Sequence, residues 1–103
     1  MHTSINSEND VVKMIEKNLS LFDSFEQVYL FGSSLRSTID NNDIDILVIY
    51  SEYSKQISSD LRIIAKKLGR ESGRFIDLTA LSEEEEKETG FVERIKPYYL
   101  KLK

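Results

Sequence analysis

The 103-residue sequence contains no cysteine, which excludes a disulfide framework, a thiolate zinc site and a thiol nucleophile. Long hydrophobic runs are also missing. The longest uninterrupted apolar stretch is Ile46–Tyr50, far too short to span a bilayer. The opening residues, MHTSINSEND, lack the basic-then-apolar order of a signal peptide. The sequence therefore predicts a cytoplasmic protein without a membrane segment.

Positive charge is in short supply. Fourteen Lys and Arg residues stand against 18 Asp and Glu residues, giving a formal net charge of −4. Sequence-independent nucleic-acid binding needs many cationic side chains, so it is not expected here. Much of the acidic excess lies in Glu83–Glu86. These residues are interpreted as the solvated first turn of a helix, with a docking patch for a basic partner as the minority alternative.

Only one proline and four glycines interrupt the chain, and its length suits a single domain, 1–103, with one modest core. Hydrophobic spacing predicts helices over about 8–19, 54–68 and from 83 onward, and strands over 27–31, 44–50 and 74–81.

Gly69 is expected to cap the second helix, Ser82 and Glu85 to form a capping box, and Gly90 to interrupt the last helix. The final YYLKLK is left open as a short strand or a loose tail. The predicted fold class is α/β (α+β), a small mixed sheet with helices packed on it and an undetermined strand order.

The most informative stretch is Gln27–Tyr50, which reads strand, Gly-Ser turn, short polar segment, strand. Gly32 ends the first strand and lets a ligand approach the main chain. Ser33 to Ser37 are predicted to form a helical turn whose free N–H groups point toward such a ligand. Because side chains alternate along a strand, Asp43 and Asp45 share one face. The same alternation in the third strand is expected to bring Asp77 to that face.

Three converging carboxylates repel one another unless cations hold them together. Magnesium suits all-oxygen ligands, and two Mg²⁺ ions can stabilise an in-line displacement at phosphorus. We therefore interpret Asp43, Asp45 and Asp77 as metal ligands and catalytic residues, with Asp77 also the candidate acceptor of a hydroxyl proton. The predicted phosphate-binding residues are Gly32, Ser33, Ser34 and Arg36. Taken alone, Asp77 could be a strand-end aspartate bound to backbone N–H groups, and Arg36 could be an ordinary surface residue.

The segment GSSLRSTIDNNDIDILV resembles the signature of the DNA polymerase beta-like nucleotidyltransferase superfamily. That signature is Gly-Ser, about ten residues, Asp-x-Asp on a strand, and a third Asp one strand later, positions that Gly32, Ser33, Asp43, Asp45 and Asp77 match. The chain looks most similar to the minimal nucleotidyltransferases. It departs from them in reading Gly-Ser-Ser-Leu-Arg-Ser, where minimal members often read Gly-Ser-Arg-x-Arg-Gly, and in having nine residues between Ser33 and Asp43.

This resemblance implies a Mg²⁺-dependent enzyme that transfers AMP from ATP to a hydroxyl. It further implies an antitoxin that modifies a tyrosine of a HEPN-domain toxin in a hetero-oligomer. Two alternatives stay open: an inactive nucleotidyltransferase-fold antitoxin that neutralises its partner by binding, and a small-molecule (antibiotic) nucleotidyltransferase. The acceptor, the preferred base, the number of nucleotides added and the oligomeric state are also open.

Overall fold

The computed structural model describes residues 8–31, 43–95 and 99–103. In chain order its elements are α1 (Glu8–Lys17), the 3₁₀ helix η1 (Leu19–Phe22), β1 (Gln27–Phe31), β2 (Asp43–Tyr50), α2 (Lys55–Ser72), β3 (Phe75–Ser82), α3 (Glu83–Thr89), α4 (Phe91–Ile95) and β4 (Tyr99–Lys101). The predicted turn after Gly32 and the single proline, Pro97, lie outside the described residues.

The four strands form one mixed sheet in the order β3-β2-β1-β4. β2 pairs in parallel with β3 and antiparallel with β1, and β1 pairs antiparallel with β4. A parallel pair needs a long crossover connection, which α2 supplies. The predicted fold class, a small α+β fold with helices packed on a mixed sheet, is confirmed. None of the helices in the described ranges has the length and hydrophobicity needed to cross a membrane.

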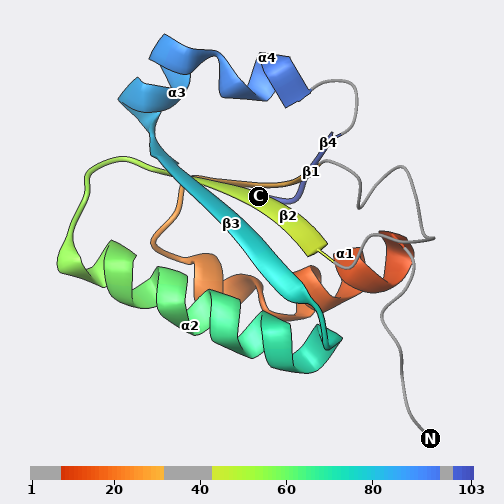
Figure 1. Ribbon diagram of the computed structural model, residues 1–103. Coiled ribbons are helices and arrows are strands. Elements are labelled where there is room, and N and C mark those ends of the chain that lie inside the picture. Colours follow the sequence, from red (N-terminus) through yellow and green to blue (C-terminus); the bar gives the residue numbers. More distant parts are fainter. Residues whose placement is uncertain (1–7, 32–42, 96–98) are drawn as a thin grey trace, which may run out of the picture.

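Helices cover both faces of the sheet (Figure 1). α1, η1 and α2 lie on one face, where Ile44, Ile46 and Val48 of β2 enter the larger core. α3 and α4 lie on the other, where Leu47 and Ile49 enter a second cluster together with partly buried residues of α4. β2 is thus the buried central strand that its β-branched, nearly all-apolar sequence predicts.

The prediction that α2 ends at Gly69 is wrong. The helix continues to Ser72, and the left-handed residue that caps it is Gly73, with φ 68°. The extra turn is retained because Ser72 is buried and Glu71 bonds to Lys17 of α1 and to Asn18, the residue that follows α1. At the next helix the predictions are confirmed, since Ser82 and Glu85 form a capping box and Gly90, with φ 62°, ends α3.

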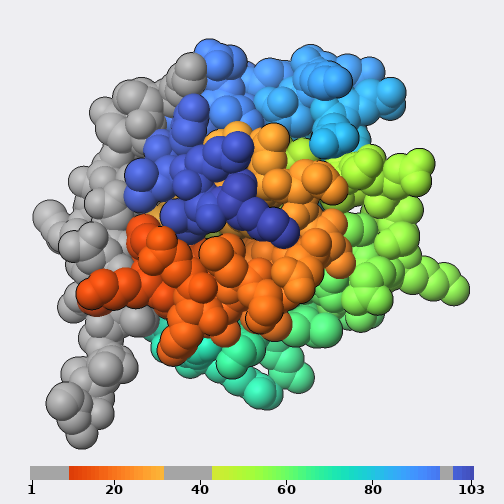
Figure 2. Space-filling model, turned by 180° about the vertical axis from the view of Figure 1, so that it is seen from behind, coloured from red at the N-terminus to blue at the C-terminus, as the bar shows by residue number. Residues whose placement is uncertain are grey.

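The C-terminal residues form a strand rather than a loose tail. β4 pairs with β1 through Tyr29↔Lys101, Leu30↔Leu100 and Phe31↔Tyr99. Figure 2 shows this dark blue segment lying against the orange part of the chain, below α3 and α4. The Lys103 ammonium donates to the Phe22 carbonyl oxygen at 2.9 Å, which fixes the end of the chain over η1.

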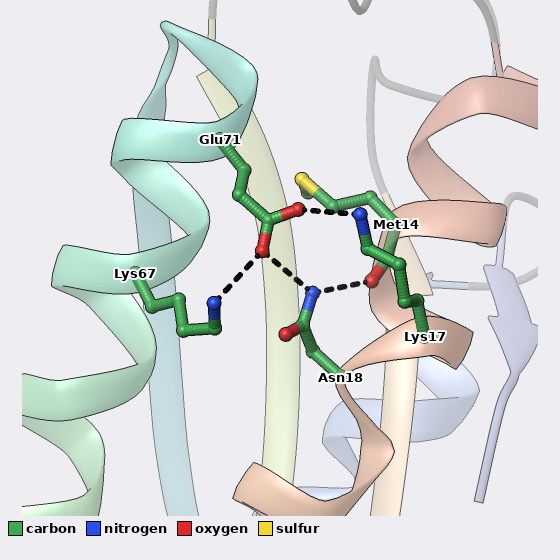
Figure 3. A network of polar contacts seen from close by, with 5 residues as sticks. All are labelled: Met14, Lys17, Asn18, Lys67 and Glu71. Carbon is green, nitrogen blue, oxygen red and sulfur yellow. Dashed lines mark hydrogen bonds and ion pairs between the residues drawn. The ribbon is translucent and has the colours of Figure 1, made fainter.

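A polar network joins the end of α1 to the last turn of α2 (Figure 3). The buried Asn18 side-chain amide donates to the Met14 carbonyl oxygen at 2.8 Å and to the Glu71 carboxylate at 3.0 Å. Lys17 and Lys67 pair with the same carboxylate at 3.0 and 3.3 Å. The hydrogen bond from Lys17 is the largest cause of the lowered pKa of Glu71. Asn18 therefore satisfies a helix-end carbonyl and anchors one helix on the other.

We expect Asn18→Ala to destabilise the fold by about 1–3 kcal/mol, because it leaves the Met14 carbonyl oxygen without this donor in a buried position. Urea unfolding followed by circular dichroism measures the change. Lys67→Ala is the matched control: it removes an exposed partner of the same carboxylate and should change stability by about 0.5 kcal/mol or less. Equal losses in the two variants would contradict the role given to Asn18.

Candidate functional site

The three predicted carboxylates lie on two neighbouring strands at one end of the sheet. Asp45 of β2 has Asp77 of β3 as its Cα partner on one side and Phe31 of β1 on the other. Asp43 is paired with Phe75 at the start of β3. Cross-strand partners point to the same face, so all three carboxylates share the face that α3 and α4 cover further along. The predicted convergence of Asp43, Asp45 and Asp77 on one face agrees with this register.

In the part of the chain that the structure describes, helical cover stops just before the carboxylates. Leu47 and Ile49, the next residues of β2 on this face, are buried by the second core cluster. Asp45 is only half-buried, and Asp43 and Asp77 are exposed. The ring of Phe31 meets that of Phe91 edge-on at 5.6 Å and forms an apolar wall on the β1 side. The carboxylates thus lie at the open margin of an otherwise covered sheet face.

Asp45 is electrostatically the most perturbed of the three. Burial, followed by the charge of Asp77, a hydrogen bond to Asp77 and the charge of Asp43, raises the pKa of the Asp45 carboxyl from 3.8 to about 6. Each cause disfavours a negative charge at this position. A divalent cation would act in the opposite direction, because it stabilises the ionised carboxylates that repel each other here.

The donor set fits a hard cation such as Mg²⁺, since it consists of carboxylate oxygens alone. In residues 8–31, 43–95 and 99–103, no three His, Cys, Asp or Glu side chains are grouped closely enough to hold a metal ion. Asp45 and Asp77 form the close pair, while Asp43 acts on Asp45 through its charge. The metal-ligand roles of Asp43, Asp45 and Asp77 therefore stay predictions.

The predicted phosphate-binding residues Gly32, Ser33, Ser34 and Arg36 lie outside the described residues. The sequence alone locates their start, because Gly32 directly follows Phe31, the β1 partner of Asp45.

Sequence reasoning missed Arg74, whose guanidinium donates to the Asp43 carbonyl oxygen at 3.3 Å. The one sequence feature that could have indicated it is its position at the start of the strand that carries Asp77.

Comparison with known proteins agrees with the fold. The family described as "Polymerase beta, Nucleotidyltransferase" matches residues 5–96, most of the chain. The protein therefore belongs to the polymerase beta nucleotidyltransferase family. Comparison with curated proteins gives no match.

Two crystal structures share the fold. One is of a mutant of the toxin–antitoxin pair MntA–HpeT, with a TM-score of 0.58 and 22% identity, covering 94% of this chain and 73% of that one. The other is of a proposed nucleotidyltransferase from Sulfolobus solfataricus, with a TM-score of 0.53 and 24% identity, covering 91% of this chain and 81% of that one. At these identities the likeness extends to the fold alone.

The raised pKa of Asp45 predicts a pH-dependent loss of stability in the metal-free protein. The folded state holds the Asp45 proton up to about pH 6, whereas the unfolded chain releases it near pH 4, so this residue lowers stability as the pH rises between those values. Asp45→Asn removes that loss. Allowing for the partial exposure of Asp45, the variant should be about 1–2 kcal/mol more stable than wild type at pH 7, with no such gain below pH 4.

Urea unfolding with EDTA, repeated from pH 4 to pH 7, measures this difference. Asp23→Asn, the same change at an exposed aspartate on the segment that enters β1, is the matched control and should not give this gain of about 1–2 kcal/mol at pH 7. An Asp45→Asn variant that gains no stability at pH 7 would contradict the raised pKa of Asp45 and the burial and carboxylate repulsion that cause it.

Proposed function

We propose that the protein is a Mg²⁺-dependent nucleotidyltransferase that transfers AMP from ATP to a hydroxyl of a partner protein. The observation that carries the proposal is the Asp45–Asp77 carboxylate pair at the open margin of the sheet, in a chain of the polymerase beta nucleotidyltransferase family. Mg²⁺ bound there would neutralise these carboxylates and the phosphates of the nucleotide.

The reaction proposed for this site is a displacement at the α-phosphorus of ATP. The acceptor oxygen forms a bond to that phosphorus, the bond to the bridging oxygen of pyrophosphate breaks, and pyrophosphate leaves. In this scheme Asp43, Asp45 and Asp77 would hold the Mg²⁺, and Asp77 would also accept the hydroxyl proton. Gly32, Ser33, Ser34 and Arg36 bind the phosphates, because main-chain N–H groups and a guanidinium suit phosphate oxygens.

The partner proposed is a HEPN-domain toxin, modified on a tyrosine and thereby silenced in the cytoplasm. Two considerations support it. The motif resembles that of the minimal nucleotidyltransferases, and the fold is shared with a chain of the MntA–HpeT toxin–antitoxin structure. The protein would then act as an antitoxin.

We expect Asp45→Asn and Asp43→Asn each to lower transfer by at least about 100-fold, because each removes a negatively charged cation ligand. The assay uses α-labelled ATP, Mg²⁺ and a purified HEPN-domain protein as the candidate acceptor, with gel detection of the labelled acceptor. Asp23→Asn should keep wild-type transfer. Full activity in Asp45→Asn would refute the catalytic assignment.

The same variants separate the enzyme from an antitoxin that works by contact alone. A catalytic antitoxin loses neutralisation of the toxin when Asp45 becomes Asn. If growth of cells that express the toxin is still rescued by Asp45→Asn, and wild type transfers no label, neutralisation by binding is the correct function.

Cation binding has a readout that does not depend on transfer. Addition of Mg²⁺ should raise the melting temperature of wild type by several degrees once its concentration is well above the dissociation constant. The shift should vanish in Asp45→Asn, where one charge of the Asp45–Asp77 pair is missing. Scanning fluorimetry measures it, and an equal shift in both proteins would contradict cation binding at this pair.

A further inference from the structure

A large aromatic side chain stands exposed beside the candidate site. Phe75, the first residue of β3, is 66% exposed. Its Cα partner is Asp43, and Asp77 follows two residues later on the same face of the strand. Side chains two residues apart in a strand lie about 7 Å from each other along the chain. The Phe75 ring is therefore within reach of any group bound at the Asp77 carboxylate.

Two contacts of the preceding residue, Arg74, hold the backbone at Phe75. The Arg74 N–H donates to the Ser72 hydroxyl oxygen at 3.1 Å, and the Arg74 guanidinium donates to the Asp43 carbonyl oxygen at 3.3 Å. These contacts tie the start of β3 to the end of α2 and to the start of β2. An aromatic ring on a fixed backbone loses little conformational freedom when a partner covers it, which favours its use as a contact.

The order of the strands assigns this ring to one of the two substrates. Asp45 lies between Phe31 of β1 and Asp77 of β3. In the proposed reaction Asp77 of β3 accepts the proton of the acceptor hydroxyl. The attacking oxygen must therefore come within hydrogen-bond reach of Asp77, on the β3 side of Asp45. Phe75 and Asp77 are both on that side.

We propose that Phe75 is the acceptor-recognition residue, whose ring packs against the aromatic side chain that carries the acceptor hydroxyl. This inference rests on the proposed function and deepens it by naming the contact that selects the acceptor. A phenol suits the position, because its hydroxyl can reach Asp77 while its ring meets Phe75 at the 4.5–7 Å centroid distances typical of aromatic pairs. An aliphatic hydroxyl would leave the Phe75 ring without this contact.

The test measures transfer from α-labelled ATP to the purified HEPN-domain protein with each substrate varied in turn. Phe75→Ala should raise the KM for the acceptor about tenfold, the size expected for an aromatic interface contact, with kcat and the KM for ATP within about twofold of wild type. Phe75→Tyr, which keeps the ring, should restore a near wild-type KM. Equilibrium dialysis with labelled ATP should show unchanged nucleotide binding in all variants.

Tyr53→Ala is the matched control. Tyr53 is 64% exposed, nearly the same as Phe75, but it follows the other end of β2, away from Asp43. Its replacement should leave the KM for the acceptor unchanged. A melting temperature is measured for every variant, because a merely structural role of Phe75 would lower the melting temperature without a selective change in KM.

The possible outcomes distinguish a failure of this inference from a failure of the proposed nucleotidyltransferase function. Labelling by wild type together with an unchanged acceptor KM in Phe75→Ala overturns the inference and leaves the transferase function standing. A rise in the KM for ATP equal to that for the acceptor also overturns it, since the ring would then contact the nucleotide. An absence of labelling by wild type overturns the proposed function and this inference with it.

Discussion

Burial of β2 on both faces is the constraint on which the rest of the structure depends. Its alternate side chains enter two separate apolar clusters, one under α1 and α2 and one under α3 and α4. A strand covered in this way needs partners on both edges, and β1 and β3 provide them. The three-layer arrangement follows from those two requirements, with a core of modest size for a chain of this length.

The candidate site exists because that burial is incomplete at one end. On the face covered by α3 and α4, β2 begins with Asp43 and Asp45 and continues with apolar residues. In the described residues, the covering helices reach only the apolar part. Partial burial leaves Asp45 hard to ionise, and Asp77 adds a second negative charge beside it. A cation bound at such a site, alone or together with a phosphate, would reduce the repulsion between the carboxylates. The polar network of Asn18 and Glu71 lies in the opposite layer, between α1 and α2.

Much of this arrangement could be predicted from the sequence. The alternation in Asp43–Tyr50 and Phe75–Ser82 gave the shared face of the carboxylates, since a strand permits only two side-chain directions. The end of α2 could not be predicted, because the burial of Ser72 and the partners of Glu71 come from residues distant in sequence. The contact of Arg74 with the Asp43 carbonyl oxygen was equally hidden, since it depends on the parallel register of two strands. Tyr99–Lys101 forms a strand by pairing with β1, which is distant in sequence. The sequence of this short segment alone therefore did not decide between a strand and a loose tail.

The parallel pairing of β2 and β3 also bears on how the protein folds. Asp45 and Asp77 are separated in sequence by the whole of α2 and become neighbours only when β2 and β3 pair. Contacts of this sequence separation form slowly, because the entropy of closing the intervening chain is lost before any pairing energy is gained. A chain still emerging from the ribosome therefore has no carboxylate pair until β3 is complete. Any activity of this site would therefore begin only once β3 has paired with β2.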